Sequence, residues 1–376
     1  MSPLLLALLL AGPPGPVAGV VFDDADGDGR RGASEPGLAG VLVSDGASVV
    51  ATDGDGSYRI ESAAARHVFV VTPGDRRASG GWYAARAERV DFALAPSPAP
   101  AAWRFAHLSD THVDEGNRER MRRALALAQE RRAELGIVTG DLVRDALRVD
   151  EATARSVYSL YATEAGRGPL PLHSMPGNHE IFGIERQHSL VPKTHPAYGK
   201  AMYEEYLGPR YHAFWRGGVL FLALDTLSFE DLEYYGLIEE GQLAWLRALL
   251  RHVPAGASVV TAGHVPLRSG RLSTEYSTDP PAPTLLSVKG VSWYRHLVRN
   301  RTALEDVLKP LRWTLALQGH THTGERLRIW DGGITRYNTA PAVDWRPGVT
   351  WVSGIVVYTV RGDVIDDGED VPLDRP

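Results

Sequence analysis

Hydrophobic and polar positions follow two different rhythms along the 376-residue chain. From Gly19 to about Ala95, short runs of alternating apolar and polar residues are separated by turns rich in Gly and Asp. This pattern predicts a small antiparallel β-sandwich. Beyond Trp103, apolar runs alternate with longer segments of helical periodicity, which predicts an α/β core with helices covering a central sheet.

The second rhythm also predicts the individual elements of the larger region. Strands are expected over residues 103–109, 136–140, 170–175, 217–225, 257–263 and 313–319. Helices are expected over residues 117–135, 150–165 and 241–252, and residues 350–365 are expected to add one or two terminal strands. The Pro- and Ala-rich stretch between the two regions is typical of a semi-rigid linker. The predicted organisation is a β-sandwich over residues 20–95, a linker over 96–102 and an α/β domain over 103–376.

An apolar stretch near the amino terminus, residues 4–11, precedes a Pro/Gly break and the small residues Ala18 and Gly19. This arrangement is typical of a secretory signal peptide, here residues 1–19, although no Lys or Arg precedes the apolar stretch. The alternative is a frayed hydrophobic terminus. We expect export to the periplasm or the cell exterior. The stretch is too short to span a bilayer, and no other segment is long and apolar enough.

Composition narrows the available chemistry. A hydrophobic content of 44% and a charged content of 23% are typical of a soluble globular protein. The formal net charge of −6 argues against nucleic acid or an anionic membrane as the main partner, because both require a basic surface. The chain has no cysteine, which excludes disulfides and thiolate nucleophiles and leaves His, Asp, Asn and Glu as metal ligands.

Polar residues of metal-ligand type follow the predicted strands of the α/β domain. Because the loops at the carboxyl ends of such strands converge on one crevice, residues far apart in the chain can meet there. Glycine precedes four of these residues, which lets the loops approach closely. In chain order the candidates are Asp110, His112, Asp141, Asn178, His179, His264, His320 and His322.

These donors are too many for one cation, and they mix imidazole with carboxylate and amide groups. Mixed shells of this kind suit Mn, Zn or Fe, whereas Mg and Ca sites are built from oxygen alone. Two cations sharing Asp141 would lie about 3.5–4 Å apart and would lower the pKa of a bridging water. A single Asp before a helix is usually a cap, and a single loop His is usually solvated. Separate caps do not explain the whole set, so the sequence predicts a dinuclear metal centre.

The order of these residues resembles that of the calcineurin-like metallophosphoesterases. The five motifs of that family are D-x-H, G-D, G-N-H-[DE], G-H and G-H-x-H, and here they begin at Asp110, Gly140, Gly177, Gly263 and Gly319. The resemblance extends over roughly residues 104–365. It implies a double-sheet αββα sandwich, preceded here by the small all-β domain, which is similar to the domain attached to some exported members.

The resemblance also implies a role for each residue. The first metal is held by Asp110, His112 and His322, the second by Asn178, His264 and His320, and both by the bridging Asp141. His179 resembles the non-ligand histidine that contacts the phosphate and protonates the leaving oxygen, and its place beside Asn178 is consistent with that role. Glu180 is expected to hydrogen-bond its turn, and His107, His173 and His212 are expected to be structural.

A second motif, DADGDGRRGASE, occupies residues 24–35 of the small domain. Asp24, Asp26 and Asp28 stand at the first, third and fifth positions, a glycine at the sixth and Glu35 at the twelfth, a spacing that supplies oxygen ligands for calcium. The flanking segments have strand patterns, so the loop resembles the calcium loops of bacterial surface domains rather than an EF-hand. The alternative is an acidic turn without an ion.

The sequence therefore predicts an exported, metal-dependent phosphoester hydrolase in which a metal-bridging hydroxide attacks phosphorus in line. The expected substrate is a small-molecule phosphate ester, and the motifs do not separate monoesters from diesters. Two alternatives stay open at this point: a cell-surface binding module with a vestigial metal centre, and hydrolysis of a non-phosphate ester on the same metals. The long polar and aromatic segment over residues 268–301 is expected to form an active-site loop.

Overall fold

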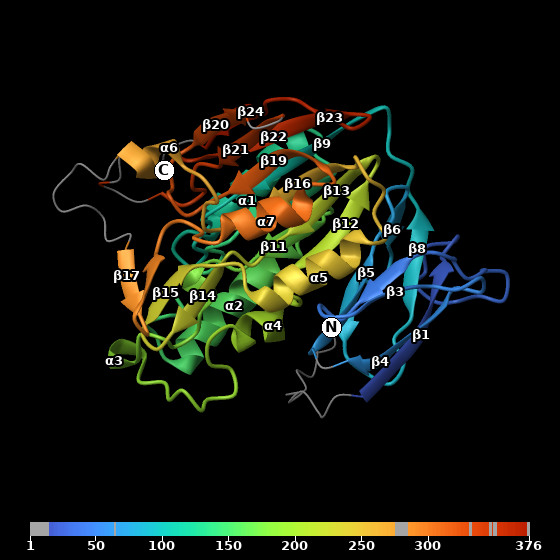
Figure 1. Ribbon diagram of the computed structural model, residues 1–376, viewed down its shortest axis with the longest axis horizontal. Helices are drawn as coiled ribbons and strands as arrows, with labels where there is room; N and C mark the ends of the chain where they lie inside the picture. The colour runs from blue at the N-terminus through green and yellow to red at the C-terminus, as the bar shows by residue number, and fades with distance from the viewer. Residues whose placement is uncertain are drawn as a thin grey trace.

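The computed structural model describes residues 15–63, 65–274, 285–330, 333–345, 348 and 352–373. Two four-stranded sheets form the amino-terminal part, which Figure 1 draws in blue to blue-green. The first has the spatial order β4 (Ser57–Ala63), β1 (Gly15–Asp23), β8 (Phe92–Pro96) and β6 (Arg76–Ala78). The second has the order β3 (Val49–Ala51), β2 (Leu42–Ser44), β5 (His67–Val71) and β7 (Tyr83–Ala85). Alternate residues of these strands, among them Val43, Ile60 and Leu94, are buried in one core. The expected all-β domain is confirmed, but it is not wholly antiparallel, because β1 and β8 pair in parallel.

Strand β1 begins within the segment expected to be a signal peptide. Gly15 pairs with Ala63 of β4, and Gly19 pairs with Tyr58. Residues 1–14, which contain the apolar stretch, lie outside the described residues, so export stays a prediction. Among the described residues, no helix is long and apolar enough to cross a membrane.

The larger part of the protein contains two six-stranded sheets. The first has the order β11 (Leu172–Met175), β10 (Leu135–Thr139), β9 (Ala102–Leu108), β22 (Gly354–Arg361) and β23 (Val364–Ile365), and β24 (Glu369–Pro372) also pairs with β22. The second has the order β12 (His212–Arg216), β13 (Val219–Ala223), β16 (Ser258–Ala262), β19 (Arg312–Gln318), β21 (Ile334–Thr339) and β20 (Glu325–Trp330). Strands β9, β10 and β11 are parallel, as are β13, β16, β19 and β21.

Helices cover the outer face of each sheet. The inner faces meet in a core that contains Phe105 and Tyr358 of the first sheet and Phe221 and Leu315 of the second. The outer face of the first sheet packs on α1 (Arg118–Glu130), α2 (Glu151–Ala165) and α4 (Ala201–Leu207), and that of the second packs on α5 (Glu240–Leu250) and α7 (Arg301–Leu308). These four layers confirm the predicted αββα sandwich (Figure 1).

Shorter elements complete the fold, and one predicted helix was too long. Two hairpins and three short helices lie in the connections: β14 (Leu227–Glu230) with β15 (Glu233–Gly236), β17 (Leu285–Val288) with β18 (Val291–Tyr294), η1 (Asn178–Glu180), α3 (Arg186–Ser189) and α6 (Gly270–Thr274). The helix expected over residues 117–135 ends at Glu130. Arg132 has a left-handed φ of 59°, which turns the chain so that Leu135 can begin β10.

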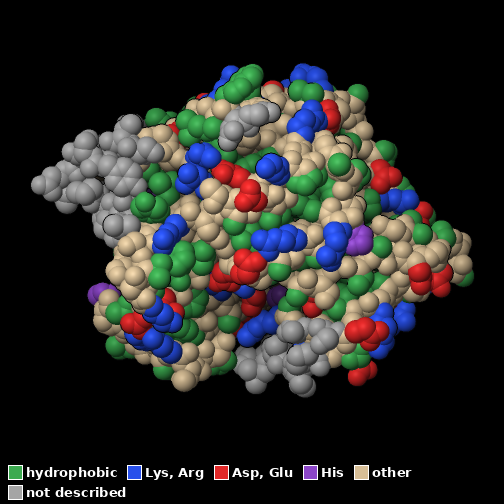
Figure 2. Space-filling view, viewed as in Figure 1, with side chains coloured by type: hydrophobic (Ala, Val, Ile, Leu, Met, Phe, Trp, Pro, Cys, Tyr) green, Lys and Arg blue, Asp and Glu red, His purple; other side chains and the backbone are tan. Residues whose placement is uncertain are grey.

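The β-sandwich packs against helix α5 and strand β12 of the α/β domain. The indole N–H of Trp245 in α5 donates to the hydroxyl of Ser44 at 3.0 Å, and Phe69 packs edge-on against the same ring. The backbone N–H of Trp215 in β12 also donates to the backbone carbonyl of Thr72 at 2.8 Å. On the face shown in Figure 2, basic and acidic side chains are interspersed over both domains.

Candidate metal centre

The candidate ligands occupy loops that leave one edge of the two sheets. The loop after β9 carries Asp110 and His112, and the loops after β10 and β16 carry Asp141 and His264. Asn178 follows β11, and both histidines of the G-H-x-H motif follow β19. Because these strands are parallel within each sheet, their carboxyl ends meet at the same edge, as the sequence predicted.

The first group of ligand atoms comes from Asp110, His112, Asp141 and His322, and these atoms lie within 4.8 Å of one another. The Nε2 atoms of His112 and His322 are 3.2 Å apart. His322 Nε2 lies 3.3 Å from Asp110 Oδ1, and His112 Nε2 lies 3.8 Å from Asp141 Oδ2. Three of the four residues are buried, so the donors face one another rather than solvent.

The second group is built around His264. Its Nε2 lies 3.2 Å from Asp141 Oδ1, 3.0 Å from His320 Nδ1 and 3.1 Å from Asn178 Oδ1. Its Nδ1 lies 2.8 Å from the carbonyl oxygen of Thr139, which fixes the ring. Asp141 thus offers Oδ1 to the second group and Oδ2 to the first, which is the geometry of a bridging carboxylate.

The chemistry of this donor set fits cations. Imidazole and carboxylate lone pairs converge from several sides, and without a positive charge between them they repel. His112, Asp141 and His264 are each at most 2% exposed, so water does not screen that repulsion. Imidazole, carboxylate and amide oxygen together are a shell that borderline divalent metals accept. The residues present therefore fit two metal ions that share Asp141.

The pKa values report the same crowding. Burial alone would raise the pKa of Asp141, but the imidazoles of His264, His179 and His112 outweigh it and hold that pKa well below its usual range. Burial lowers the pKa of His264, whereas Asp141 raises it more, to about 9. Burial and the neighbouring His179 hold the pKa of His112 well below its usual range. The pair thus favours positive charge at this position, which a bound cation would supply.

The ligand loops have a strained backbone. Left-handed φ angles of 49°, 41°, 49°, 74° and 60° occur at Asp110, His112, Asp141, His320 and His322. Each such residue costs about 1–3 kcal/mol, and conformations of this kind concentrate at functional sites. Gly177 and Gly319 permit the close approach of the loops: a Cβ atom would lie 2.2 Å from the backbone nitrogen of Asp141 in the first case and 2.0 Å from Ser109 Oγ in the second.

His179 lies beside both groups without belonging to either. Its backbone N–H donates to Asp141 Oδ1 at 3.0 Å, and its Nδ1 lies 2.6 Å from the carbonyl oxygen of Arg144. Its Nε2 lies 3.9 Å from Asp141 Oδ2, so the ring is turned toward the centre. The guanidinium of Arg144 is paired with Asp114 and with the buried Asp344, which fixes the carbonyl that holds His179.

Glu180 accepts hydrogen bonds from the backbone of two ligand loops, and hydrogen bonding within its turn was expected from the sequence. One carboxylate oxygen accepts the N–H groups of Leu142 and Val143 at 2.8 and 2.9 Å, and the other accepts the N–H of Gly177 at 2.7 Å. Burial raises the pKa of Glu180 to about 8, and Asp141 adds to the shift. These contacts join the loop after β10 to the loop after β11.

The histidines expected to be structural are buried away from the ligand groups. His107 Nε2 lies 2.9 Å from the hydroxyl oxygen of Thr139 in the core between the sheets. His173 Nδ1 lies 3.0 Å from His212 Nε2, and the His173 ring stacks on Phe214. Their environments account for them without a catalytic role.

The sequence did not single out His296. Its Nδ1 lies 2.5 Å from His320 Nε2, so the segment over residues 268–301 does reach the centre. Tyr234 of β15 also packs edge-on against His320, with ring centroids 6.2 Å apart. A lone histidine in a long polar segment has no spacing that indicates a role, and only the tertiary fold brings it to His320. Residues 275–284 of the segment lie outside the described residues.

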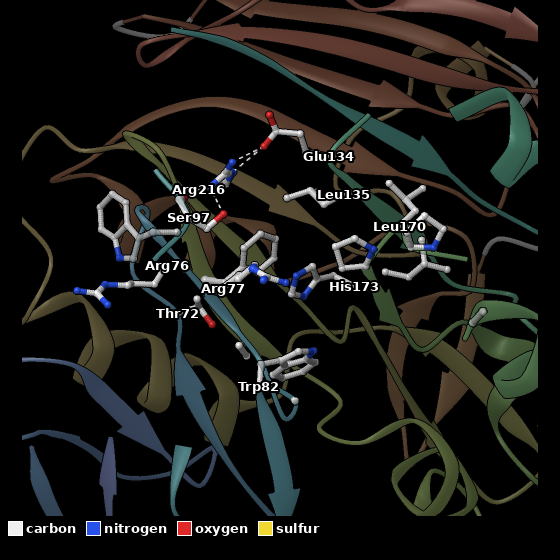
Figure 3. A pocket seen from close by; sticks show the side chains of 18 of the residues that line it. Thr72, Arg76, Arg77, Trp82, Ser97, Glu134, Leu135, Leu170, His173 and Arg216 are labelled. Atoms are coloured by element: carbon white, nitrogen blue, oxygen red, sulfur yellow. Dashed lines mark hydrogen bonds and ion pairs between the residues drawn. The ribbon is translucent and has the colours of Figure 1, made fainter. Parts of the chain in front are cut away.

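A separate pocket of about 560 Å³ lies between the two domains (Figure 3). It is lined by Arg77 and Trp82 of the β-sandwich and by Leu135 and His173 of the α/β domain. Leu135 and Leu172 begin β10 and β11, so the pocket lies at the amino ends of these strands. The candidate ligands gather at the opposite ends.

The acidic loop of the small domain is only partly gathered. Ligand atoms of Asp24, Asp26 and Glu35 lie within 4.8 Å of one another, whereas Asp28 is not in the group. The carboxylates of all four residues accept backbone N–H groups of the loop, and that of Asp28 accepts the N–H of Arg30 at 2.7 Å. Three of the four predicted calcium ligands are therefore gathered, and Asp28 is not among them.

Two ligand groups joined by a shared carboxylate at the strand ends of this layered fold define a metal-binding protein. The family model described as calcineurin-like phosphoesterase matches residues 104–324, more than half of the chain, and the model for the N terminal of calcineurin-like phosphoesterase matches residues 25–85. The chain belongs to the calcineurin-like phosphoesterases and is a metal-dependent hydrolase of phosphoric esters. The family assignment made from the motifs is confirmed.

Two similar solved structures share little sequence with the chain. No curated protein matches it. Similar solved structures include a dimetal phosphatase from Danio rerio, with a TM-score of 0.46, 14% identity, and coverage of 72% of this chain and 98% of that chain. GAP50, the anchor in the inner membrane complex of Plasmodium, has a TM-score of 0.42 and 14% identity, with coverage of 73% and 90%.

Proposed function

We propose that the protein hydrolyses a small phosphate ester at a centre of two divalent cations. Asp110, His112 and His322 would hold the first cation, Asn178, His264 and His320 the second, and Asp141 both. The observation that carries the proposal is the position of Asp141, whose two carboxylate oxygens face different groups of imidazoles. Two cations bound here would supply a water of lowered pKa and would neutralise charge on the phosphate oxygens.

His179 is the residue that we assign to proton transfer. A carbonyl oxygen can only accept a hydrogen bond, so the contact with Arg144 places the proton of neutral His179 on Nδ1. Nε2, which is turned toward the ligand groups, is then the nitrogen that gains and gives the exchangeable proton. Once protonated, it can donate to the leaving oxygen of the ester, a contribution of about 10²–10⁴-fold to turnover.

The direct test is hydrolysis of p-nitrophenyl phosphate and bis-p-nitrophenyl phosphate with added Mn²⁺ or Zn²⁺. We expect turnover with at least one ester, and the ratio of the two rates decides between monoesterase and diesterase action. Asp141→Asn should abolish turnover, and His179→Ala should lower it while both cations stay bound. The exposed His188 supplies the matched control, since His188→Ala should leave turnover unchanged. No turnover with either metal would favour a binding module instead.

We also propose that the acidic loop of the small domain binds calcium. The convergence of Asp24, Asp26 and Glu35 supports this, as does Gly29 at the sixth position, whose φ of 75° bends the loop. Calorimetric titration with Ca²⁺ should show one site that Glu35→Gln removes. Asp53→Asn, in another acidic turn of the small domain over residues 53–57, should leave that site intact, and a flat titration of the native protein would refute the proposal.

A further inference from the structure

His320 is engaged at both ring nitrogens. Its Nδ1 lies 3.0 Å from His264 Nε2, inside the second ligand group. Its Nε2 lies 2.5 Å from Nδ1 of His296, with the two ring centroids 4.8 Å apart. His296 belongs to neither ligand group, so its contact with the centre runs through His320.

The fold holds His296 in place from both sides. On one side, the guanidinium of Arg295 is paired with the carboxylate of Glu233 in β15. On the other side, the N–H of Val298 donates to the carbonyl of Pro266 at 2.9 Å, in the loop that follows β16 and carries His264. The backbone of His296 is therefore tied to two elements that border the second ligand group.

The ring of His320 depends on these surroundings. Its backbone N–H donates to Asp110 Oδ2 at 3.0 Å, but that bond leaves the side chain free to rotate. Tyr234 touches the ring edge-on, and the Arg295 guanidinium lies 5.1 Å from the centroid of the Tyr234 ring. Tyr234 limits the tilt of the imidazole, while His296 makes the hydrogen-bonding contact at the nitrogen opposite the ligand atom.

The contact between the two imidazoles also selects a tautomer. A neutral imidazole has one N–H and one lone pair, and a hydrogen bond between two such rings needs one donor and one acceptor. If Nδ1 of His320 presents its lone pair to a cation, then its proton must be on Nε2. Nε2 can then donate to the Nδ1 lone pair of His296, whose own proton is on Nε2.

We propose that His296 is a positioning residue that fixes the tautomer and the ring orientation of His320 for the second cation. The proposal rests on the two-cation centre proposed above and adds to it a residue outside the ligand groups. Removal of a hydrogen-bond partner of this kind lowers metal affinity by about 10–100-fold. The loss should fall on the second cation, because the hydrogen-bonding contact of His296 is with His320, a proposed ligand of that cation.

The experiment measures metal binding without substrate. Metal-free protein is titrated with Mn²⁺ and followed by electron paramagnetic resonance, which separates a single Mn²⁺ from an exchange-coupled pair. In His296→Phe, which keeps the ring but has no acceptor, the coupled pair should require about 10–100-fold more Mn²⁺, with the first cation unaffected. His296→Asn should restore much of the affinity, because its amide oxygen can accept the Nε2 proton of His320.

Two controls keep this test separate from the proposed function. Ser292→Ala, at an exposed position of β18, should bind both cations as the native protein does. Thermal unfolding of the metal-free variants checks that each is folded. Native affinity at both sites in His296→Phe, an equal loss at both sites, or no recovery in His296→Asn would overturn the proposal. A native protein that binds two cations but hydrolyses no ester would instead refute the function and leave the role of His296 standing.

Discussion

Replacing His107 by Gln should make the protein less sensitive to acid. The imidazole of His107 lies between the two sheets and is 0% exposed to solvent. This burial lowers its pKa from 6.5 to about 3. Because the folded-state pKa is depressed, His107 has no effect on stability above pH 6.5 and reduces stability as the pH falls from 6.5 toward 3. Gln has no group that titrates in this range, and its amide can still reach the hydroxyl of Thr139.

The size of the effect follows from the two pKa values. At about pH 5 the unfolded chain gains RT ln(1 + 10^1.5), about 2 kcal/mol, from protonation of this one imidazole. The folded chain gains almost nothing, because its pKa lies about two units lower than that pH. Between about pH 7.5 and pH 5, His107 should therefore remove about 2 kcal/mol of the unfolding free energy.

The assay is urea unfolding of the metal-free protein at the two pH values, followed by tryptophan fluorescence. The drop in unfolding free energy between the two pH values should be about 2 kcal/mol smaller in His107→Gln than in the native protein. Other titrating groups contribute to both proteins and cancel in this difference. His252→Gln, at an exposed position, is the matched control and should leave the drop unchanged. An identical drop in His107→Gln and the native protein would show that His107 is not held neutral by burial.

Three further perturbations have defined outcomes. Gly319→Ala should lower turnover by about 10²-fold and the unfolding free energy by about 1–3 kcal/mol, because the new Cβ would lie 2.0 Å from Ser109 Oγ and would push two ligand loops apart. Gly241→Ala, with open space around it, should lower neither quantity, and reaction rates and urea unfolding measure both. Trp245→Phe should cost about 1 kcal/mol in urea unfolding by removing the bond to Ser44 that joins the domains, and an unchanged midpoint would contradict that account. Removal of bound metal by a chelator should lower the thermal unfolding temperature. Restored Mn²⁺ should raise that temperature and add about 2.7 kcal/mol to the unfolding free energy at a hundredfold excess over Kd; equal curves would argue against tight binding.

Much of this architecture could be predicted because short sequence patterns determine the strands, the helix starts and the ligand loops. The motif residues stand directly after apolar strands, so their convergence at one sheet edge follows from strand direction alone. Asp150 was expected to begin a helix, and its carboxylate does accept the N–H of Thr153 at the start of α2. The glycines before Asn178 and His320 indicated close loop contacts, which the structure explains by the absence of space for a Cβ.

Other features depend on long-range packing that a local pattern does not contain. His296 has no motif around it and reaches His320 only because β15 and the loop after β16 hold its neighbours. The end of α1 at Glu130 is set by the need to return Leu135 to the first sheet, although helical periodicity continues further. The β20–β21 hairpin has an alternating pattern around Leu327 and Ile329 that could have been read from the sequence and was not.

The most direct measurement is the anomalous diffraction of crystals soaked in Mn²⁺. Two anomalous peaks are expected about 3.5–4 Å apart, one on each side of the Asp141 carboxylate. The first should lie against His112 and His322 and the second against His264 and His320. A single peak, or two peaks that do not both contact Asp141, would show that the protein does not bind two cations through a shared carboxylate.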